Sequence, residues 1–390
     1  MTIRENADIE NWIAKEPPEP VIEPDLPIID PHHHLWDLRG NSRMGFRQEV
    51  YLCEEISRDI ADSGHNIVQT VFAQCGAFYR ADGPSEMRSV GETEFVHGVA
   101  AMSRSGLYGP TRLCTGIFSA ADLRLGDEVK PVLEAHLQAS DNFRGIRTAF
   151  PSDLNASFLA GFGLLEQFNL SYDNWSPDFT RLPGLARLAN QFPGVTVIVN
   201  HLGGKIDPEA DEDEIAAWKS AIDSVAACSN TVMKLGGAQM RIDAWEPPYH
   251  MHQTGSPWSS EAFLETLLPR YQYALEAFGP ERCMFESNFP VDKDCISYRT
   301  LWNLFKRIAA QLGLSEAEKN GCLQWHRCTR LPFAGPLGRL AEFPDGPGRL
   351  LNGCVRVGAG AGIGVCKRDI AKALSRDLVR RLSKRPVLIP

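Results

Sequence analysis

Two histidines, one residue apart, end a short apolar segment near the start of the 390-residue chain. The segment reads Ile28-Ile29-Asp30-Pro31-His32-His33-His34-Leu35-Trp36-Asp37. Residues i and i+2 of a β-strand point to the same face, so the pattern predicts that His32 and His34 converge while His33 points away. Two convergent imidazoles can polarise a carbonyl group or bind a metal ion. The apolar and aromatic neighbours do not fit a surface histidine run of the kind that a tag leaves.

Other residues able to take part in catalysis also lie at the ends of short apolar segments. They are Asp173, His201, Lys234, Glu286, Asn288 and Asp292. One histidine in such a place is more often a hydrogen-bonded structural group than a functional one. Three of them, His32, His34 and His201, at one edge of a sheet favour a functional site.

Eight short apolar segments predict the strands that position these residues. They are 28–30, 67–75, 113–118, 143–148, 170–173, 195–200, 231–235 and 283–285. Helix-like segments separate them, as at 131–139, 182–191, 214–228 and 261–278. Strands that alternate with helices predict a parallel sheet with crossover helices, and eight such units predict an α/β fold, the (β/α)₈ barrel, with its active site at the carboxyl ends of the strands. The alternative is a doubly wound open sheet, but no Gly-x-Gly-x-x-Gly follows an early strand.

Charge and composition divide the chain into three parts. Residues 1–25 are Pro-rich, with Pro17-Pro18-Glu19-Pro20, and predict an extended N-terminal arm; residues 26–319 predict the barrel. Residues 320–390 contain 13 Lys and Arg against 4 Asp and Glu, whereas residues 1–319 contain 27 against 45. The basic tail holds ten glycines and little apolar periodicity. It lacks the aromatic interleaving and Lys clusters of a nucleic-acid-binding arm.

The composition predicts a soluble, cytoplasmic protein. The chain is 43% hydrophobic and 23% charged with a formal net charge of −9. No apolar run approaches the roughly 20 residues of a spanning helix, and the first residues are polar and acidic rather than a signal peptide. The ten cysteines include no CxxC pair, so we expect mostly buried, reduced thiols. No nucleic acid or membrane partner is expected, and the sequence leaves a homo-oligomer open.

Five motifs in the same order resemble the amidohydrolase superfamily. The matching segments are 29–37, Arg144-Gly145-Ile146-Arg147, Val199-Asn200-His201-Leu202-Gly203, Val232-Met233-Lys234-Leu235-Gly236-Gly237 and 279–290. The chain is most similar to the amidohydrolase-related group that includes 2-pyrone-4,6-dicarboxylate lactonase. The resemblance implies that His32, His34 and His201 surround the reacting carbonyl and that an acid after the eighth strand is the general base.

Two departures from the family pattern change what the resemblance implies. Asn288 stands where the family usually has Asp, and the fifth strand ends in Asp173-Asn174-Trp175 rather than in a histidine. An amide cannot accept a proton from water at neutral pH. The ligands left for one divalent, zinc-like metal are His32, His34 and His201; the resembling lactonases also include members without a metal, so the cofactor is one metal or none.

The general base must then be another group. We expect Asp173 in this role, on the view that Glu286 points outward and Asp292 caps a helix; His201 is the alternative. Arg80, Arg144, Arg147 and Lys234 are the candidate substrate-binding cations, because guanidinium groups bind carboxylates through two parallel hydrogen bonds. Such cations would admit an anionic small molecule against the acidic field of residues 1–319.

Residues 320–390 are predicted to be frameshifted read-through. One codon choice for Lys319 to Phe333 reads, after removal of a single A, Lys-Thr-Ala-Ala-Phe-Asn-Gly-Thr-Ala-Ala-Arg-Val-Tyr-Arg, which resembles the usual family ending. We therefore expect residues after about 335 to be disordered apart from a helix near 367–382.

These observations together predict a hydrolase that opens a lactone of a small carboxylated metabolite by attack of water on a His-polarised carbonyl. A metal-dependent decarboxylase of the same barrel family is one alternative. A catalytically silent ligand-binding barrel, favoured by Asn288, is the other.

Overall fold

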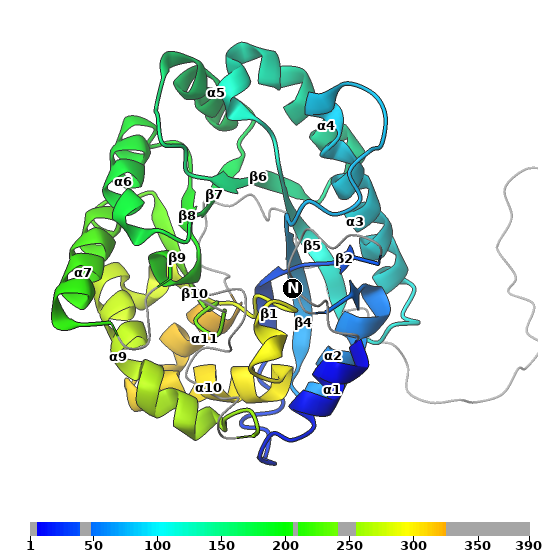
Figure 1. Ribbon diagram of the computed structural model, residues 1–390, viewed down its shortest axis with the longest axis vertical. Helices are drawn as coiled ribbons and strands as arrows, with labels where there is room; N and C mark the ends of the chain where they lie inside the picture. Colours follow the sequence, from blue (N-terminus) through cyan, green and yellow to red (C-terminus); the bar gives the residue numbers. More distant parts are fainter. Residues whose placement is uncertain (1–5, 40–47, 206–209, 241–254, 325–390) are drawn as a thin grey trace, which may run out of the picture. The chain divides into compact units, whose positions relative to one another are not determined.

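A closed eight-stranded parallel barrel forms the centre of the protein (Figure 1). The computed structural model describes residues 6–39, 48–205, 210–240 and 255–324. The barrel strands, in their order around the sheet, are β1 (Ile28–His33), β4 (Ile67–Ala73), β5 (Arg112–Ser119), β6 (Phe143–Ala149), β7 (Ser171–Trp175), β8 (Val197–Val199), β9 (Thr231–Leu235) and β10 (Cys283–Phe285). The backbone N–H of His34 donates to the carbonyl of Phe289 at 2.7 Å and closes the ring between β1 and the segment after β10. The predicted (β/α)₈ barrel is confirmed.

Helices connect the strands and surround them (Figure 1). They are α2 (Cys53–Ser63), α3 (Val90–Arg104), α4 (Lys130–Ala139), α5 (Ala156–Gln167), α6 (Leu182–Gln191), α7 (Glu212–Ala226), α9 (Ser260–Phe278), α10 (Tyr298–Gln311) and α11 (Glu316–Gln324). Polar residues at the N-caps define where several of them begin: Asp211 accepts the N–H of Glu214, and Ser259 accepts that of Ala262. A small antiparallel pair, β2 (Trp36–Asp37) with β3 (Val50–Tyr51), follows β1 outside the barrel.

The apolar residues form two separate clusters. The larger lies between the strands and the helices. The smaller contains Val71, Phe118, Ile198, Val232 and Met284. These five come from β4, β5, β8, β9 and β10, and residues of such distant strands meet only inside a closed barrel. They form an apolar plug in the barrel interior.

The plug determines which polar residues face the interior above it. Side chains alternate along a strand, so the residues two positions after Ile198, Val232 and Met284 face the same way. Those residues are Asn200, Lys234 and Glu286, each at most 2% exposed. The interior at the carboxyl ends of the strands is therefore a buried polar layer above an apolar one.

The N-terminal arm is not wholly extended, contrary to the prediction. Helix α1 (Asn6–Ile13) occupies part of it, with Ile9 fully buried. Glu16 accepts the N–H of Ser297 at 2.9 Å and Glu19 that of Ser260 at 3.1 Å, so two arm carboxylates lie at the N-termini of α10 and α9. Carboxylates at a helix N-terminus accept hydrogen bonds from its otherwise unpaired N–H groups and interact favourably with the helix dipole. This is why a charged, Pro-rich segment folds against the barrel.

The predicted boundary at residue 320 divides a helix. Helix α11 continues through Gln324, and Cys322 and Leu323 are buried in the core. The predictions for residues after 335, including the helix near 367–382, lie outside the described residues. The seven cysteines in the described part of the chain are free thiols, as expected, and six of them are buried. None of the helices in that part is both long and apolar enough to cross a membrane.

Candidate active site

His32 and His34 converge as the strand pattern predicts. Their Nε2 atoms lie 3.2 Å apart, and both side chains are buried. His33 points elsewhere: its Nε2 lies 2.8 Å from Thr70 Oγ1 within the barrel wall. The middle histidine of the triplet is thus a buried structural residue rather than an exposed one.

Asn288 lies against His34 with two hydrogen-bond acceptors facing each other. His34 Nδ1 is 2.8 Å from the carbonyl oxygen of Ala73, which only accepts, so Nδ1 carries the proton. Burial, and secondarily the charge of Arg147, holds the pKa of His34 well below its usual value, so the ring is neutral and Nε2 carries a lone pair. Asn288 donates its Nδ2 to Asp292 at 2.7 Å and turns Oδ1 toward His34 Nε2 at 3.2 Å. No proton lies between these two acceptors.

Glu286 points into the site, which corrects the prediction that it faces outward. Its Oε1 is 2.7 Å from His201 Nδ1, and its Oε2 is 2.7 Å from His32 Nδ1. It is fully buried, since it follows the interior residue Met284 by two positions. Because a carboxylate only accepts, His201 carries its proton on Nδ1 and presents Nε2 as a base. The result is a carboxylate-oriented histidine.

The backbone around His201 is arranged to bring this ring over the site. His201 has φ +53° and Leu202 φ +54°, a left-handed conformation that side-chain-bearing residues rarely adopt. A Cβ at Gly237 would lie 2.4 Å from His201 Nδ1, so only glycine lets the chain after β9 pass the ring. Strain of this kind is concentrated at functional sites.

Asp173 is held by cations rather than poised as a base. It accepts from Lys234 Nζ at 2.7 Å and from Asn200 Nδ2, and Arg147 Nε lies 3.5 Å from it. Arg147 also donates to the carbonyl of Gln74 at 2.7 Å. These contacts engage its lone pairs and favour a positioning role toward Lys234 and Arg147 over the predicted role of general base.

Two of the four predicted substrate-binding cations lie away from this cluster. Arg80 forms an ion pair with Glu94 on the surface. Arg144 is the second residue of β6 and donates to the carbonyls of Asp141 and Phe143. It therefore lies at the opposite end of the strand from Arg147. The position of each arginine along β6, rather than its residue type, separates the two.

Asp292 is a buried partner of Asn288 rather than a helix cap. It is fully buried, and burial raises its pKa well above the usual value, with the nearby Glu286 carboxylate adding to the effect. Its Oδ2 has no hydrogen-bond partner.

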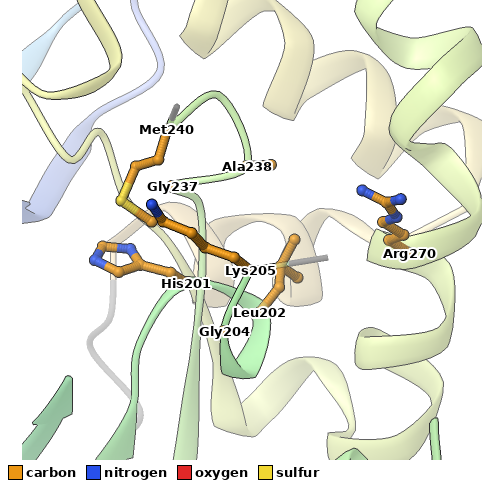
Figure 2. A pocket seen from close by; sticks show the side chains of 8 residues that line it. All are labelled: His201, Leu202, Gly204, Lys205, Gly237, Ala238, Met240 and Arg270. Carbon is orange, nitrogen blue, oxygen red and sulfur yellow. The ribbon is translucent and has the colours of Figure 1, made fainter. Parts of the chain in front are cut away.

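A hollow opens beside His201 (Figure 2). It is lined by His201, Leu202, Gly204, Lys205, Gly237, Ala238, Met240 and Arg270. Lys205 runs alongside His201 toward Met240, whereas Arg270 reaches the hollow from α9 (Figure 2). Trp175, with its ring 4.9 Å from that of His201 and 5.6 Å from the Arg147 guanidinium, packs against the same histidine. Neither Lys205 nor Trp175 is predictable as a site residue from the sequence, because single cations and aromatics at strand ends carry no spacing signal.

This geometry agrees with a match to a known family. The family model for amidohydrolases matches residues 29–324. The chain belongs to the amidohydrolase family. As a member it is a hydrolase, and the cluster at the carboxyl ends of its strands is where enzymes of this fold carry out chemistry.

Two curated proteins are similar to the chain in sequence. Protein y4mH of Sinorhizobium fredii, which is uncharacterised, is 32% identical over 320 residues, covering 75% of this chain and 94% of its own. An L-fucono-1,5-lactonase of Burkholderia multivorans is 30% identical over 190 residues, covering 47% of this chain and 58% of its own. The alignment thus spans little more than half of the lactonase.

Solved amidohydrolase structures show the same fold. An amidohydrolase of Burkholderia multivorans with bound HEPES has a TM-score of 0.59 at 21% identity, over 78% of this chain and 99% of its own. A second structure of it, with bound zinc, has a TM-score of 0.57 at 21% identity and the same coverage.

Two overlapping groups of residues in this amidohydrolase could hold a metal ion. In the described ranges, His32, His201 and Glu286 offer ligand atoms within 4.8 Å of one another. His32, His34 and Asn288 form the second group, with the 3.2 Å contacts given above. The predicted set of His32, His34 and His201 mixes the two.

Proposed function

We propose that this amidohydrolase opens lactones by attack of water on the ring carbonyl, with His201 as the general base. The observation that carries the proposal is the contact of 2.7 Å between His201 Nδ1 and Glu286 Oε1. It fixes the proton on Nδ1, so Nε2 accepts the proton of an attacking water. The similarity to a lactonase supports an ester ring as the substrate.

Positive charge at the site would stabilise the oxyanion that forms. Lys234 and Arg147 are held at the end of the barrel by Asp173, so their charges are in place before the substrate arrives. Fixed charges in a buried site stabilise developing negative charge without reorganisation. We therefore assign Asp173 to positioning and His201, not Asp173, to proton transfer.

The residues present fit a divalent metal, and the two protonation patterns of His32 show why. With a proton on Nε2, His32 accepts from Lys234 Nζ at 3.1 Å and donates to His34, but Glu286 Oε2 and Asn288 Oδ1 then face only lone pairs. With the proton on Nδ1, His32 satisfies Glu286, and His32 Nε2, His34 Nε2 and Asn288 Oδ1 become three acceptors around one point. A cation bound by these three atoms would satisfy all of them. When bound, such a metal would polarise the substrate carbonyl as a Lewis acid.

We prefer this ligand group to the one that contains His201. The proton shared by His201 and Glu286 already satisfies that pair, whereas the acceptors of His34 and Asn288 have no donor between them. The zinc-bound relative of the same fold supports zinc as the metal. The cytoplasmic location and a homo-oligomer stay predictions.

A panel of lactones tests the function. We expect the purified protein to hydrolyse at least one δ-lactone, either with added zinc or after chelation. The protons released by hydrolysis would be measured with a pH indicator. His201→Ala should abolish that turnover, while His65→Gln, at a buried histidine outside the site, should retain it. Release of CO₂ from carboxylated aromatic acids, without lactone turnover, would assign the protein to the decarboxylases. Binding without turnover of any kind would contradict an enzyme.

A further inference from the structure

A fully buried carboxyl group lies outside the cluster described above. It belongs to Glu92, in the first turn of α3. Its Oε1 accepts the backbone N–H of Cys75 at 3.1 Å and that of Ala77 at 2.9 Å. In the part of the chain that the structure describes, all of its hydrogen bonds come from residues 75–77 and none from a lysine or arginine. A carboxyl group is costly to bury unless such bonds compensate, so the loop after β4 is the partner of Glu92.

The same loop turns a carbonyl group toward the site. The Gln74 carbonyl accepts from Arg147 Nη1 at 2.7 Å. Gln74 C=O and Cys75 N–H belong to one trans peptide group, in which the two bonds point in opposite directions. With the N–H toward Glu92, the carbonyl points the other way, toward Arg147. One rigid peptide plane therefore connects Glu92 to Arg147.

This peptide group determines where the Arg147 guanidinium points. In the described residues, the bond to the Gln74 carbonyl is the one hydrogen bond that the Arg147 side chain donates. Its ion pair with Asp173 is longer, at 3.5 Å, and its Nε has no hydrogen-bond partner. Arg147 is 6% exposed, so water replaces little of this support. The direction of the guanidinium therefore depends on the direction of the Gln74 carbonyl.

Helix α3 lies close to the loop that Glu92 contacts. A Cβ at Gly91 would lie 2.6 Å from the carbonyl oxygen of Phe78 and 2.8 Å from the backbone nitrogen of Arg80. Only glycine allows this approach of one backbone to another. The packing therefore fixes the distance between the helix and the loop, and the side chain at position 92 must be long enough to span it.

We propose that Glu92 is a positioning residue of this hydrolase: it fixes the Gln74–Cys75 peptide group so that the carbonyl holds Arg147 at the site. The inference rests on the proposed role of Arg147, which is to stabilise the oxyanion. The reach of the acceptor oxygen matters here rather than its charge. Burial raises the pKa of Glu92 to about 7, although the N–H groups of residues 75–77 oppose the shift. Near neutral pH both forms of the carboxyl group are present, and both carry the acceptor.

Two substitutions separate reach from charge. Glu92→Gln keeps the length and the acceptor oxygen but removes the charge, whereas Glu92→Asp keeps the charge and shortens the side chain. We expect kcat of Glu92→Gln to stay within about threefold of the parent. That of Glu92→Asp should fall about tenfold or more with little change in KM. The opposite order, equal losses in the two variants, or no loss in either would overturn the inference.

Glu16→Asp is the matched control. Glu16 also accepts a backbone N–H, that of Ser297 at 2.9 Å, together with the Thr300 hydroxyl at 2.7 Å, but it attaches the N-terminal arm to α10. The same shortening there should lower Tm and leave kcat within about twofold of the parent. A loss of kcat equal to that of Glu92→Asp would mean that a loosened fold slows the enzyme, and the inference would fail.

A double-mutant cycle tests whether Glu92 acts through Arg147. In an Arg147→Met background, Glu92→Asp should lower kcat by less than about twofold, because the group that Glu92 positions is absent. The full loss in that background would show that Glu92 acts by another route. An Arg147→Met variant as active as the parent would remove the role of Arg147 and, with it, the inference.

Crystal structures of the two free variants distinguish a failure of this inference from a failure of the proposed function. Arg147 Nη1 should keep its contact with the Gln74 carbonyl in Glu92→Gln and lose it in Glu92→Asp. A protein that hydrolyses no lactone but gives these two structures would disprove the function and retain the positioning role. A Glu92→Asp structure with the contact unchanged would overturn the positioning role, whatever the substrate.

Discussion

His34 at the end of the barrel and His65 near the N-terminal arm are both buried, yet their hydrogen bonding differs. His65 Nδ1 accepts from Lys306 Nζ at 3.0 Å, and its Nε2 donates to the carbonyl of Arg299 at 3.2 Å. Both nitrogens therefore have complementary partners. His34 has one fixed complementary partner, Ala73, and its other nitrogen lies 3.2 Å from both the acceptor Asn288 Oδ1 and His32 Nε2.

The comparison separates structural from functional buried histidines better than burial does. A histidine whose two nitrogens are satisfied within the protein stabilises the fold. A histidine that keeps an unsatisfied lone pair among other acceptors is arranged for a proton, a cation or a substrate. The Lys306 ammonium also donates to the carbonyls of Ile22 and Glu23, so the His65 group attaches the N-terminal arm to α10.

The largest expected effect is the loss of His201. His201→Ala should lower kcat for a lactone by about 10²–10⁴-fold, the usual contribution of a general base, with little change in Tm. His65→Gln should do the reverse, since glutamine can replace only part of the His65 contacts. Steady-state kinetics and thermal unfolding of both variants would check this. Similar losses of kcat in the two would remove the distinction drawn above.

Within the histidine triplet the same distinction applies between neighbouring residues. His32→Ala and His34→Ala should each lower kcat/KM by about 10²-fold or more. His33→Ala should instead destabilise the fold by about 1–3 kcal/mol, because Thr70 loses a buried hydrogen bond. Denaturant unfolding and kinetics on folded protein separate the two outcomes. Loss of turnover in a stably folded His33→Ala variant would show that His33, rather than only His32 and His34, faces the site.

The double variant Asn288→Asp/Asp292→Asn should bind zinc about tenfold more tightly than the parent, whereas Asn288→Asp alone should not. Alone, the new carboxylate would lie beside that of Asp292, where Asn288 Nδ2 now donates at 2.7 Å. Two carboxylates in contact share a proton, and the proton competes with the metal. Competition with a chromogenic chelator should therefore rank Asn288→Asp/Asp292→Asn above Asn288→Asp. The reverse order would place the metal at His201 and Glu286.

The free energy of unfolding should depend on pH in a way that reflects the titration of His65. Burial, followed by the charge of Lys306, lowers its pKa to about 3, against about 6.5 in an unfolded chain. Between these values the unfolded state binds the extra proton, so His65 makes stability fall as pH falls from about 6.5 toward 3. His65→Gln should flatten the curve of unfolding free energy against pH in that window. An unchanged slope would mean that His65 titrates normally in the folded protein.

Removal of residues 335–390 should have the smallest effect. The unit that contains the barrel ends at Ala334, so truncation after it should leave kcat/KM within about twofold of the full chain, a difference of ~0.4 kcal/mol. Restoring the reading frame at Asn320 should raise Tm, and resequencing of the gene would check the frame. Loss of activity on truncation, with the sequence confirmed, would contradict read-through.

The sequence by itself determined the barrel and the convergence of His32 with His34. Both follow from local periodicity: strands alternate with helices, and i and i+2 share a face. It also pointed to His201, Lys234 and Asn288, because each stands at the end of an apolar segment. Each of these features depends only on residues that are neighbours in the sequence, so no contact between distant segments is needed to predict it.

Only the tertiary structure decided which way Glu286 points and what each polar group meets. Strands of a parallel barrel are buried on both faces, so Cys283-Met284-Phe285 is apolar throughout and does not reveal which residues face inward. Closure of the ring places Met284 in the plug and therefore Glu286 against His32 and His201. The same closure pairs Asp173 with Lys234, which are 61 residues apart. The carboxylate that the sequence suggested as a base is therefore engaged by an ammonium group. Inward direction and charge pairing depend on register between distant strands, and register is a property of the assembled barrel.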